Sequence, residues 1–155
     1  MITGKNYIGN LLSSIGNKTF KTFNPQTNLE NEIVYNEASE VEIEQATLLA
    51  ASAFKSFQKV SGTKKSEFLN EIANQIEALG DELIQTYCSE TGLPEGRAMG
   101  ERGRTVFQLR SFANLVKDGS WVEAAIDTAD LDRQPMPKVD IRKMLVPLGP
   151  VVVFG

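Results

Sequence analysis

The sequence predicts an α/β fold, and three features of its residue pattern support this. Short β-type runs separated by turn residues occupy 1–37, stretches of helical periodicity follow up to residue 118, and residues 151–154 form a continuous apolar run. An apolar run that does not alternate is typical of a strand covered on both faces of a parallel sheet. The predicted architecture is a β-hairpin layer, about four helices, two extended arms and the first strand of a Rossmann-like parallel sheet.

The first 37 residues are expected to form antiparallel strands. Tyr7-Ile8, residues 19–23 and residues 33–35 are rich in β-branched and aromatic side chains. Gly16-Asn17 and Asn24-Pro25 separate these runs and are typical turn dipeptides. A small hairpin layer is therefore predicted ahead of the helices.

The first helix is predicted over residues 40–58. Ser39 and Glu42 have the spacing of a capping box, in which each residue satisfies a free backbone donor of the other. The residues that follow repeat their apolar side chains at helical spacing. One face of this helix then carries Ile43, Ala46, Ala50, Ala53, Phe54 and Phe57.

Three further helices are expected before residue 118. Thr63 is predicted to cap the second helix, and Gly80 interrupts the pattern before Asp81, which is predicted to cap a short third helix. Gly92 occupies the position that glycine favours just after a helix. A fourth helix is predicted over residues 94–117, with Pro94 at its start.

Two extended arms are expected after the helices. Residues 121–126 and 139–141 alternate in part and are β-like, and the acidic, proline-bearing stretch 127–137 between them is typical of an exposed loop. The arms either reach a neighbouring subunit or form an ordinary hairpin packed on their own domain. Spacing alone does not choose between these two alternatives.

Composition excludes several classes of function. The 155 residues carry a net charge of −4 and have a pI near 5.0, so nucleic acid is not an expected partner. A single cysteine and the absence of histidine rule out an internal disulfide and a Cys/His metal site. No stretch has the length of a signal-peptide core or a membrane span, so we expect a cytoplasmic protein with no membrane partner.

Several short motifs, taken in order, resemble the aldehyde dehydrogenase superfamily. Residues 23–27 are similar to its F-N-P-x-T turn, residues 90–94 match its E-T-G-K-P turn with Leu93 in place of lysine, and residues 109–113 resemble its L-R-Y-Y-A segment. Residues 147–155 resemble the segment that leads into its cofactor-binding sheet. Each motif is weak alone, but the ordered set covers nearly the whole chain.

The resemblance implies a specific organisation. Residues 1–118 would be the N-terminal part of the cofactor-binding domain, 119–146 oligomerisation-type β arms, and 147–155 the first strand of the nucleotide-binding sheet. Residues 100–105 and the ending Phe154-Gly155 look most like the branch that acts on 2,5-dioxopentanoate (α-ketoglutaric semialdehyde). The chain would then be the N-terminal fragment of an enzyme that forms homo-oligomers and oxidises a small-molecule aldehyde.

The resemblance also implies where the chemistry lies. Such enzymes attack the aldehyde with a cysteine thiolate, pass a hydride to NADP or NAD, and hydrolyse the thioester with the help of a glutamate. Those residues would lie past Gly155, so the chain alone is expected to be inactive and Cys88 is interpreted as a packing residue. Phe154 and Gly155 would lie against the cofactor, whose 2′ position is read by later residues.

The fourth predicted helix carries the one candidate binding site. By three- and four-residue spacing, Arg104 and Gln108 share a polar face with Arg97, Glu101 and Ser111. This face is either solvated and braced by an Arg97–Glu101 pair, or it binds a carboxylate. The resemblance places Arg104 close to a helix position that lines the substrate tunnel. This puts the carboxylate site on an equal footing with the solvated face.

Two rival functions remain open at this point. The same helices and arms could serve a non-catalytic assembly or binding module, which would share the architecture without the chemistry. An acyl-phosphate reductase of the same fold would differ in substrate rather than in architecture. The residues that continue the apolar run 151–154 would discriminate between these hypotheses.

Overall fold

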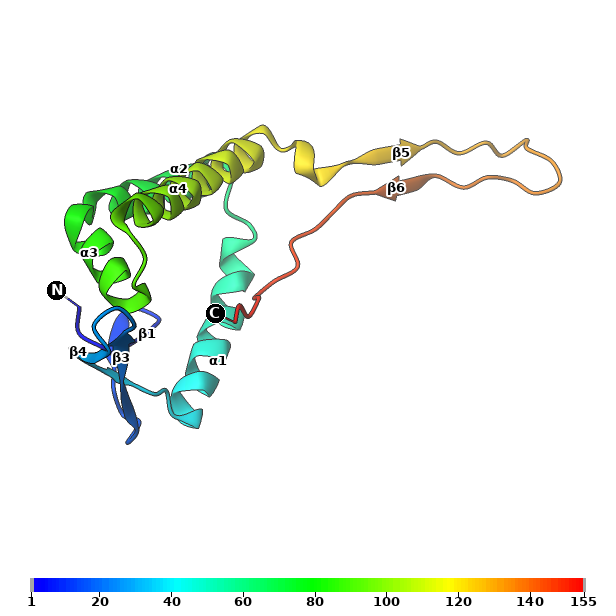
Figure 1. Ribbon diagram of the computed structural model, residues 1–155. Coiled ribbons are helices and arrows are strands. Elements are labelled where there is room, and N and C mark those ends of the chain that lie inside the picture. Colours follow the sequence, from blue (N-terminus) through cyan, green and yellow to red (C-terminus); the bar gives the residue numbers. More distant parts are fainter. Residues whose placement is uncertain (1, 155) are drawn as a thin grey trace.

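Four helices form the body of the chain. The computed structural model describes residues 2–154 and contains α1 (Glu40–Phe57), α2 (Gly62–Ala78), α3 (Gly80–Thr91) and α4 (Glu95–Asp118). Figure 1 shows α2 and α4 side by side, with α3 next to them and α1 standing apart. The four predicted helices are confirmed, with bounds close to those expected.

Two of the predicted helix caps are wrong. The Ser61 hydroxyl, not Thr63, caps α2 by accepting a hydrogen bond from the backbone N–H of Lys64 at 3.3 Å. Asp81 already lies inside α3, because the chain turns at Gly80, where a φ of 56° is easy only for glycine. The prediction for Gly92 is confirmed: it ends α3 in a left-handed conformation.

The hairpin layer has four short strands. β1 (Asn6–Ile8) pairs with β2 (Leu11–Ser13), and β3 (Thr19–Asn24) pairs with β4 (Leu29–Asn36), both antiparallel. β2 was not predicted. The first hairpin turns at Gly9-Asn10, and the predicted turn at Gly16-Asn17 is instead part of the connection from β2 to β3. Glycine-asparagine is a favoured two-residue hairpin turn, and this signal was available in the sequence. The turn predicted at Asn24-Pro25 is present between β3 and β4.

A buried carboxylate joins the hairpins to α1. The capping box predicted from Ser39 and Glu42 is present, with the Ser39 N–H donating to Glu42 Oε2 at 2.8 Å. The side chain of Glu42 is fully buried, and its Oε1 accepts further hydrogen bonds from the Ser13 hydroxyl and the Ile15 N–H. These donors, first of all the Ser13 hydroxyl, lower the pKa of Glu42 from 4.5 to about 2.

Helices α2 and α4 pack closely through small side chains. Ala73 of α2 and Ala113 of α4 are completely buried, and Val106 is nearly so. At Gly62 a Cβ atom would lie 2.2 Å from the carbonyl oxygen of Val116, so only glycine allows this approach. Small residues at the crossing let the two backbones come near each other.

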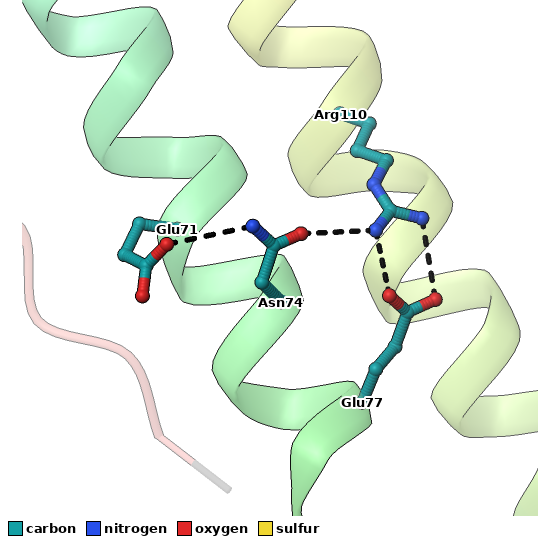
Figure 2. A network of polar contacts seen from close by, with 4 residues as sticks. All are labelled: Glu71, Asn74, Glu77 and Arg110. Atoms are coloured by element: carbon teal, nitrogen blue, oxygen red, sulfur yellow. Dashed lines mark hydrogen bonds and ion pairs between the residues drawn. The ribbon is translucent and has the colours of Figure 1, made fainter.

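An arginine fork secures the same helix pair. Figure 2 shows Arg110 of α4 reaching Glu77 and Asn74 of α2. Its Nη2 lies 2.6 Å from Glu77 Oε2, its Nη1 lies 3.2 Å from Glu77 Oε1, and Nη2 also donates to Asn74 Oδ1 at 3.2 Å. A bidentate contact of this kind fixes the orientation of the guanidinium as well as its distance from the carboxylate. It therefore holds α4 in one orientation on α2.

The predicted arms form a ribbon that extends away from the helices. β5 (Ala125–Asp127) pairs antiparallel with β6 (Ile141–Lys143), and all six strand residues are exposed. Figure 1 shows the ribbon projecting from the end of α4, so it is not packed on its own domain. The first predicted arm is partly wrong, because a 3₁₀ helix, η1 (Ser120–Val122), takes up its start.

The predicted first strand of a parallel sheet stays a prediction, because its partner strands would come from residues that follow it in the sequence. Residues 147–154 have no strand partner among the described residues, and every observed strand pair is antiparallel. Val151 is 67% exposed and Phe154 is 92% exposed. A strand is defined by hydrogen bonds to its neighbour, and the apolar composition alone supplies none. Gly155, which was predicted together with Phe154 to end this strand and lie against the cofactor, is outside the described residues.

Within residues 2–154, no helix has the length and apolar character needed to span a lipid bilayer.

Candidate functional site

A hollow of about 410 Å³ lies between α2 and α4. It contains both residues that the sequence predicted as substrate-binding, Arg104 and Gln108. They are one helical turn apart, so their side chains leave α4 in the same direction. The walls are formed by Leu69, Glu101, Arg104, Thr105, Gln108, Leu109 and Phe112.

Arg104 differs from the other arginines of α4. Arg97 pairs with Glu101, Arg102 donates to the carbonyl oxygen of Gly80 at 3.3 Å, and Arg110 is held by the fork described above. Over residues 2–154, Arg104 makes no hydrogen bond and no ion pair. Its guanidinium is exposed and has its donors available for an anion.

The predicted polar face of α4 is present in part. The Arg97–Glu101 pair is confirmed, with Nη2 and Oε1 2.5 Å apart. Glu101 turns toward the hollow and lines it, whereas Ser111 is half-buried and does not line it. An ion pair therefore braces the start of this face, and Arg104, which has no partner among residues 2–154, follows one turn later. The carboxylate-binding interpretation of the face stays a prediction.

Three apolar members of the hollow, Leu69, Leu109 and Phe112, were not predicted from the sequence. Phe112 belongs to the segment 109–113, which was interpreted only as a family motif, and Leu69 belongs to the apolar stripe of α2. Spacing along α4 could have placed Phe112 one turn after Gln108. No signal in the sequence could have placed Leu69 there, because its position depends on how α2 crosses α4.

Cys88 lies on α3, away from this hollow. It is a free thiol, half-buried rather than fully buried, and it is absent from the residues that line the Arg104 site. Its backbone carbonyl accepts the hydrogen bond that ends α3 at Gly92, at 2.9 Å. The packing role predicted for its side chain stays a prediction.

The described part of the predicted cofactor segment does not form a cradle for a nucleotide. Residues 147–154 include no strand end, no helix N-terminus and no hydrogen bond to another element, and Phe154 is almost fully exposed. A dinucleotide site in an open α/β sheet needs strand ends and a helix N-terminus together. The residues in hand therefore do not by themselves fit NAD or NADP.

The residues that line the hollow can bind an anion. A guanidinium and a carboxamide can together hold a carboxylate, and the apolar walls of Leu69, Leu109 and Phe112 suit a short carbon chain. The lining residues include no cysteine and no histidine. This arrangement can orient a small acid whose reacting end lies elsewhere.

Comparison with known proteins identifies relatives of this chain. Residues 12–155 match the model of the aldehyde dehydrogenase family. Alpha-ketoglutaric semialdehyde dehydrogenase 2 from Azospirillum brasilense is 42% identical over 155 residues, covering 99% of this chain and 30% of that protein. Alpha-ketoglutaric semialdehyde dehydrogenase from Acinetobacter baylyi is 38% identical, covering 98% and 29%. The chain thus spans about 30% of the length of these curated relatives.

Solved structures share the fold. An aldehyde dehydrogenase from Bacillus cereus superposes with a TM-score of 0.72 at 28% identity, covering 83% of this chain and 26% of that one. Betaine aldehyde dehydrogenase from Staphylococcus aureus, solved with NAD+, gives a TM-score of 0.74 at 17% identity, covering 84% and 26%. Since the family model matches most of the chain and the ordered motifs agree with it, this chain belongs to the aldehyde dehydrogenase family.

Proposed function

We propose that this chain is the N-terminal part of an enzyme that oxidises α-ketoglutaric semialdehyde to 2-oxoglutarate. Two relatives of that name are 42% and 38% identical over nearly the whole chain. The observation that carries the proposal is Arg104, which has no partner among residues 2–154 and lies in a hollow with apolar walls. In this scheme Arg104 and Gln108 bind the carboxylate of the substrate, and the aldehyde end points to catalytic residues that follow in the sequence.

The proposed cofactor is NAD or NADP. The support is family membership and the NAD+ present in a structure of the same fold. Because residues 147–154 form no nucleotide cradle, later parts of the enzyme would supply most of the cofactor contacts. The role predicted for Phe154 and Gly155 at the cofactor stays a prediction.

We also propose that the enzyme is a homo-oligomer and that the ribbon takes part in its assembly. The ribbon of β5 and β6 projects from the body, and Ile126 and Ile141 on it are 66% and 53% exposed. A two-stranded ribbon is marginally stable alone, so contact with a second copy would stabilise it. A cytoplasmic location remains a prediction from the sequence.

The decisive experiment compares two aldehydes in the full-length enzyme carrying Arg104→Ala. We expect KM for α-ketoglutaric semialdehyde to rise by a factor that corresponds to about 2 kcal/mol or more, because the carboxylate loses its guanidinium partner. KM for pentanal, which has the same chain length and no charge, should change little. Gln108→Ala should act in the same sense with a smaller effect.

The control variant is Lys64→Ala, which removes an exposed cation from the first turn of α2, where it pairs with Glu67 at 2.9 Å. It should leave both KM values unchanged. Equal changes for the two aldehydes in Arg104→Ala, or no change for either, would contradict a carboxylate-binding role and leave the proposed substrate without its structural support.

A further inference from the structure

We propose that Arg97 is a positioning residue that keeps Arg104 available to the substrate by holding Glu101. This inference rests on the carboxylate site proposed above and adds a specificity-determining residue to it. The three side chains succeed one another along α4 at spacings of four and three residues, so Glu101 stands between two arginines on one face. Which arginine binds Glu101 therefore decides whether Arg104 is free.

The geometry shows that Arg97 binds Glu101. The Nη2 of Arg97 and Oε1 of Glu101 are 2.5 Å apart, which is a short, charge-assisted contact. Arg97 is the more solvated member, with 62% of its side chain exposed against 35% for Glu101. The carboxylate of Glu101 is thus held at the edge of the hollow by a cation that lies outside it.

Glu101 would otherwise compete with the substrate. It lines the same hollow as Arg104 and lies three residues before it, a spacing at which glutamate and arginine on a helix form ion pairs. With Arg97 in place, the guanidinium groups of Arg97 and Arg104 are balanced by one carboxylate, that of Glu101. One net positive charge then remains to attract the anion of the substrate. Without Arg97 the charges cancel, and Glu101 becomes an internal ligand of Arg104.

If the Arg97–Glu101 pair had a purely structural role, its loss would lower the free energy of unfolding and would not change KM selectively for charged substrates. Exposed ion pairs contribute little to the free energy of unfolding, so loss of the Arg97–Glu101 pair should barely change stability. Loss of the pair should instead raise KM for charged substrates. This separation between stability and KM is what a positioning role requires.

The test uses the full-length enzyme carrying Arg97→Ala. We expect KM for α-ketoglutaric semialdehyde to rise about threefold to fivefold, the size expected for one partly solvated charge interaction, with kcat nearly unchanged. KM for pentanal should stay the same. Arg97→Lys, which keeps the charge, should retain most of the affinity for the charged substrate.

A second substitution supplies the sharper evidence. In the double variant Arg97→Ala with Glu101→Gln, the competing charge is gone, and KM for α-ketoglutaric semialdehyde should return to about the wild-type value. Lys64→Ala serves as the matched control, because it breaks another exposed ion pair within a helix and removes the same charge. It should leave KM for both aldehydes unchanged.

The outcomes separate this inference from the site on which it rests. If Arg104→Ala raises KM for the charged aldehyde but Arg97→Ala does not, the carboxylate site stands and the role of Arg97 is wrong. A rise in Arg97→Ala that Glu101→Gln fails to reverse also overturns the inference. If Arg104→Ala has no selective effect, the carboxylate site falls, and the positioning role falls with it.

Discussion

Helix α1 and the α2–α4 pair have the same amphipathic sequence pattern, but they differ in how far their apolar side chains are buried. The pair buries its small apolar residues and is fastened by the fork from Arg110 to Glu77. In contrast, Val41, Ile43 and Leu48 of α1 are 64%, 55% and 63% exposed. Figure 1 shows most of α1 apart from the other helices. Its end touches α2, where the rings of Phe57 and Phe68 lie edge to face with centroids 6.0 Å apart. The apolar pattern of α1 has therefore produced a helix with little core around it.

The two regions are held by different forces. Close packing at Gly62 and Ala113 stabilises the pair, since small side chains allow many atoms of the two helices to touch. Polar contacts hold the start of α1 instead, where Glu42 accepts hydrogen bonds from Ser13, Ile15 and Ser39. Apolar periodicity therefore predicts that a helix forms, whereas its burial depends on what the rest of the molecule places beside it.

The largest effect is expected where the α2–α4 pair is tightest. Gly62→Ala would place a Cβ 2.2 Å from the carbonyl oxygen of Val116, and the helices must separate to admit it. We expect the free energy of unfolding to fall by about 2–3 kcal/mol, as measured by urea denaturation followed by circular dichroism.

Gly103→Ala is the matched control for that substitution. Among the described residues, nothing lies within 4 Å of the Cβ position of Gly103, which sits in the middle of α4. Alanine there should stabilise the helix by up to about 1 kcal/mol. If both substitutions gave the same sign, close approach of the backbones would not be what holds the pair together.

The anchor of α1 should give a smaller effect that depends on pH. Because the pKa of Glu42 is lowered to about 2 in the folded chain, its stabilising contribution is complete above pH 4.5 and is lost as the pH falls toward 2. The free energies of unfolding of the wild type and Glu42→Gln should thus differ at pH 6 and converge near pH 2. Denaturation curves at several pH values check this, with Glu44→Gln on an exposed turn of α1 as the control. A difference that stays constant with pH would mean that the charge of Glu42 is not what anchors the helix.

The parts of the structure that local rules govern were predictable from the sequence. The capping box at Ser39 and the end of α3 at Gly92 depend on a few adjacent residues, and both are confirmed. The start of α2 was placed two residues late, since Ser61 and Thr63 are both acceptable caps and only the path of the chain selects one. The strand over 151–154 stays a prediction, since the neighbouring strands that would pair with it are expected to come from later residues.

The candidate site likewise contains residues that local spacing could predict and residues that depend on long-range packing. Arg104 and Gln108 could be grouped because they lie one turn apart on a single helix. Leu69 could not be added to them, since it comes from another helix whose crossing with α4 is set by long-range packing. Spacing predicted that Glu101 pairs with Arg97. It could not show that Arg104 has no partner among residues 2–154, because another element of the fold could have supplied one.

The smallest effect within this chain is expected on the exposed face of α1, and the same substitution reports what covers that face in the enzyme. Leu48→Ala should change the free energy of unfolding of the 155-residue chain by less than about 0.5 kcal/mol, because the side chain is mostly in water. In the full-length enzyme it should cost about 2 kcal/mol or more if later residues bury Leu48. Val106→Ala is the reference, since Val106 is buried here already and should cost about 1–3 kcal/mol in both proteins. An equally small effect of Leu48→Ala in both would mean that α1 stays exposed in the enzyme, and its contrast with the α2–α4 pair would then be a permanent feature of the fold.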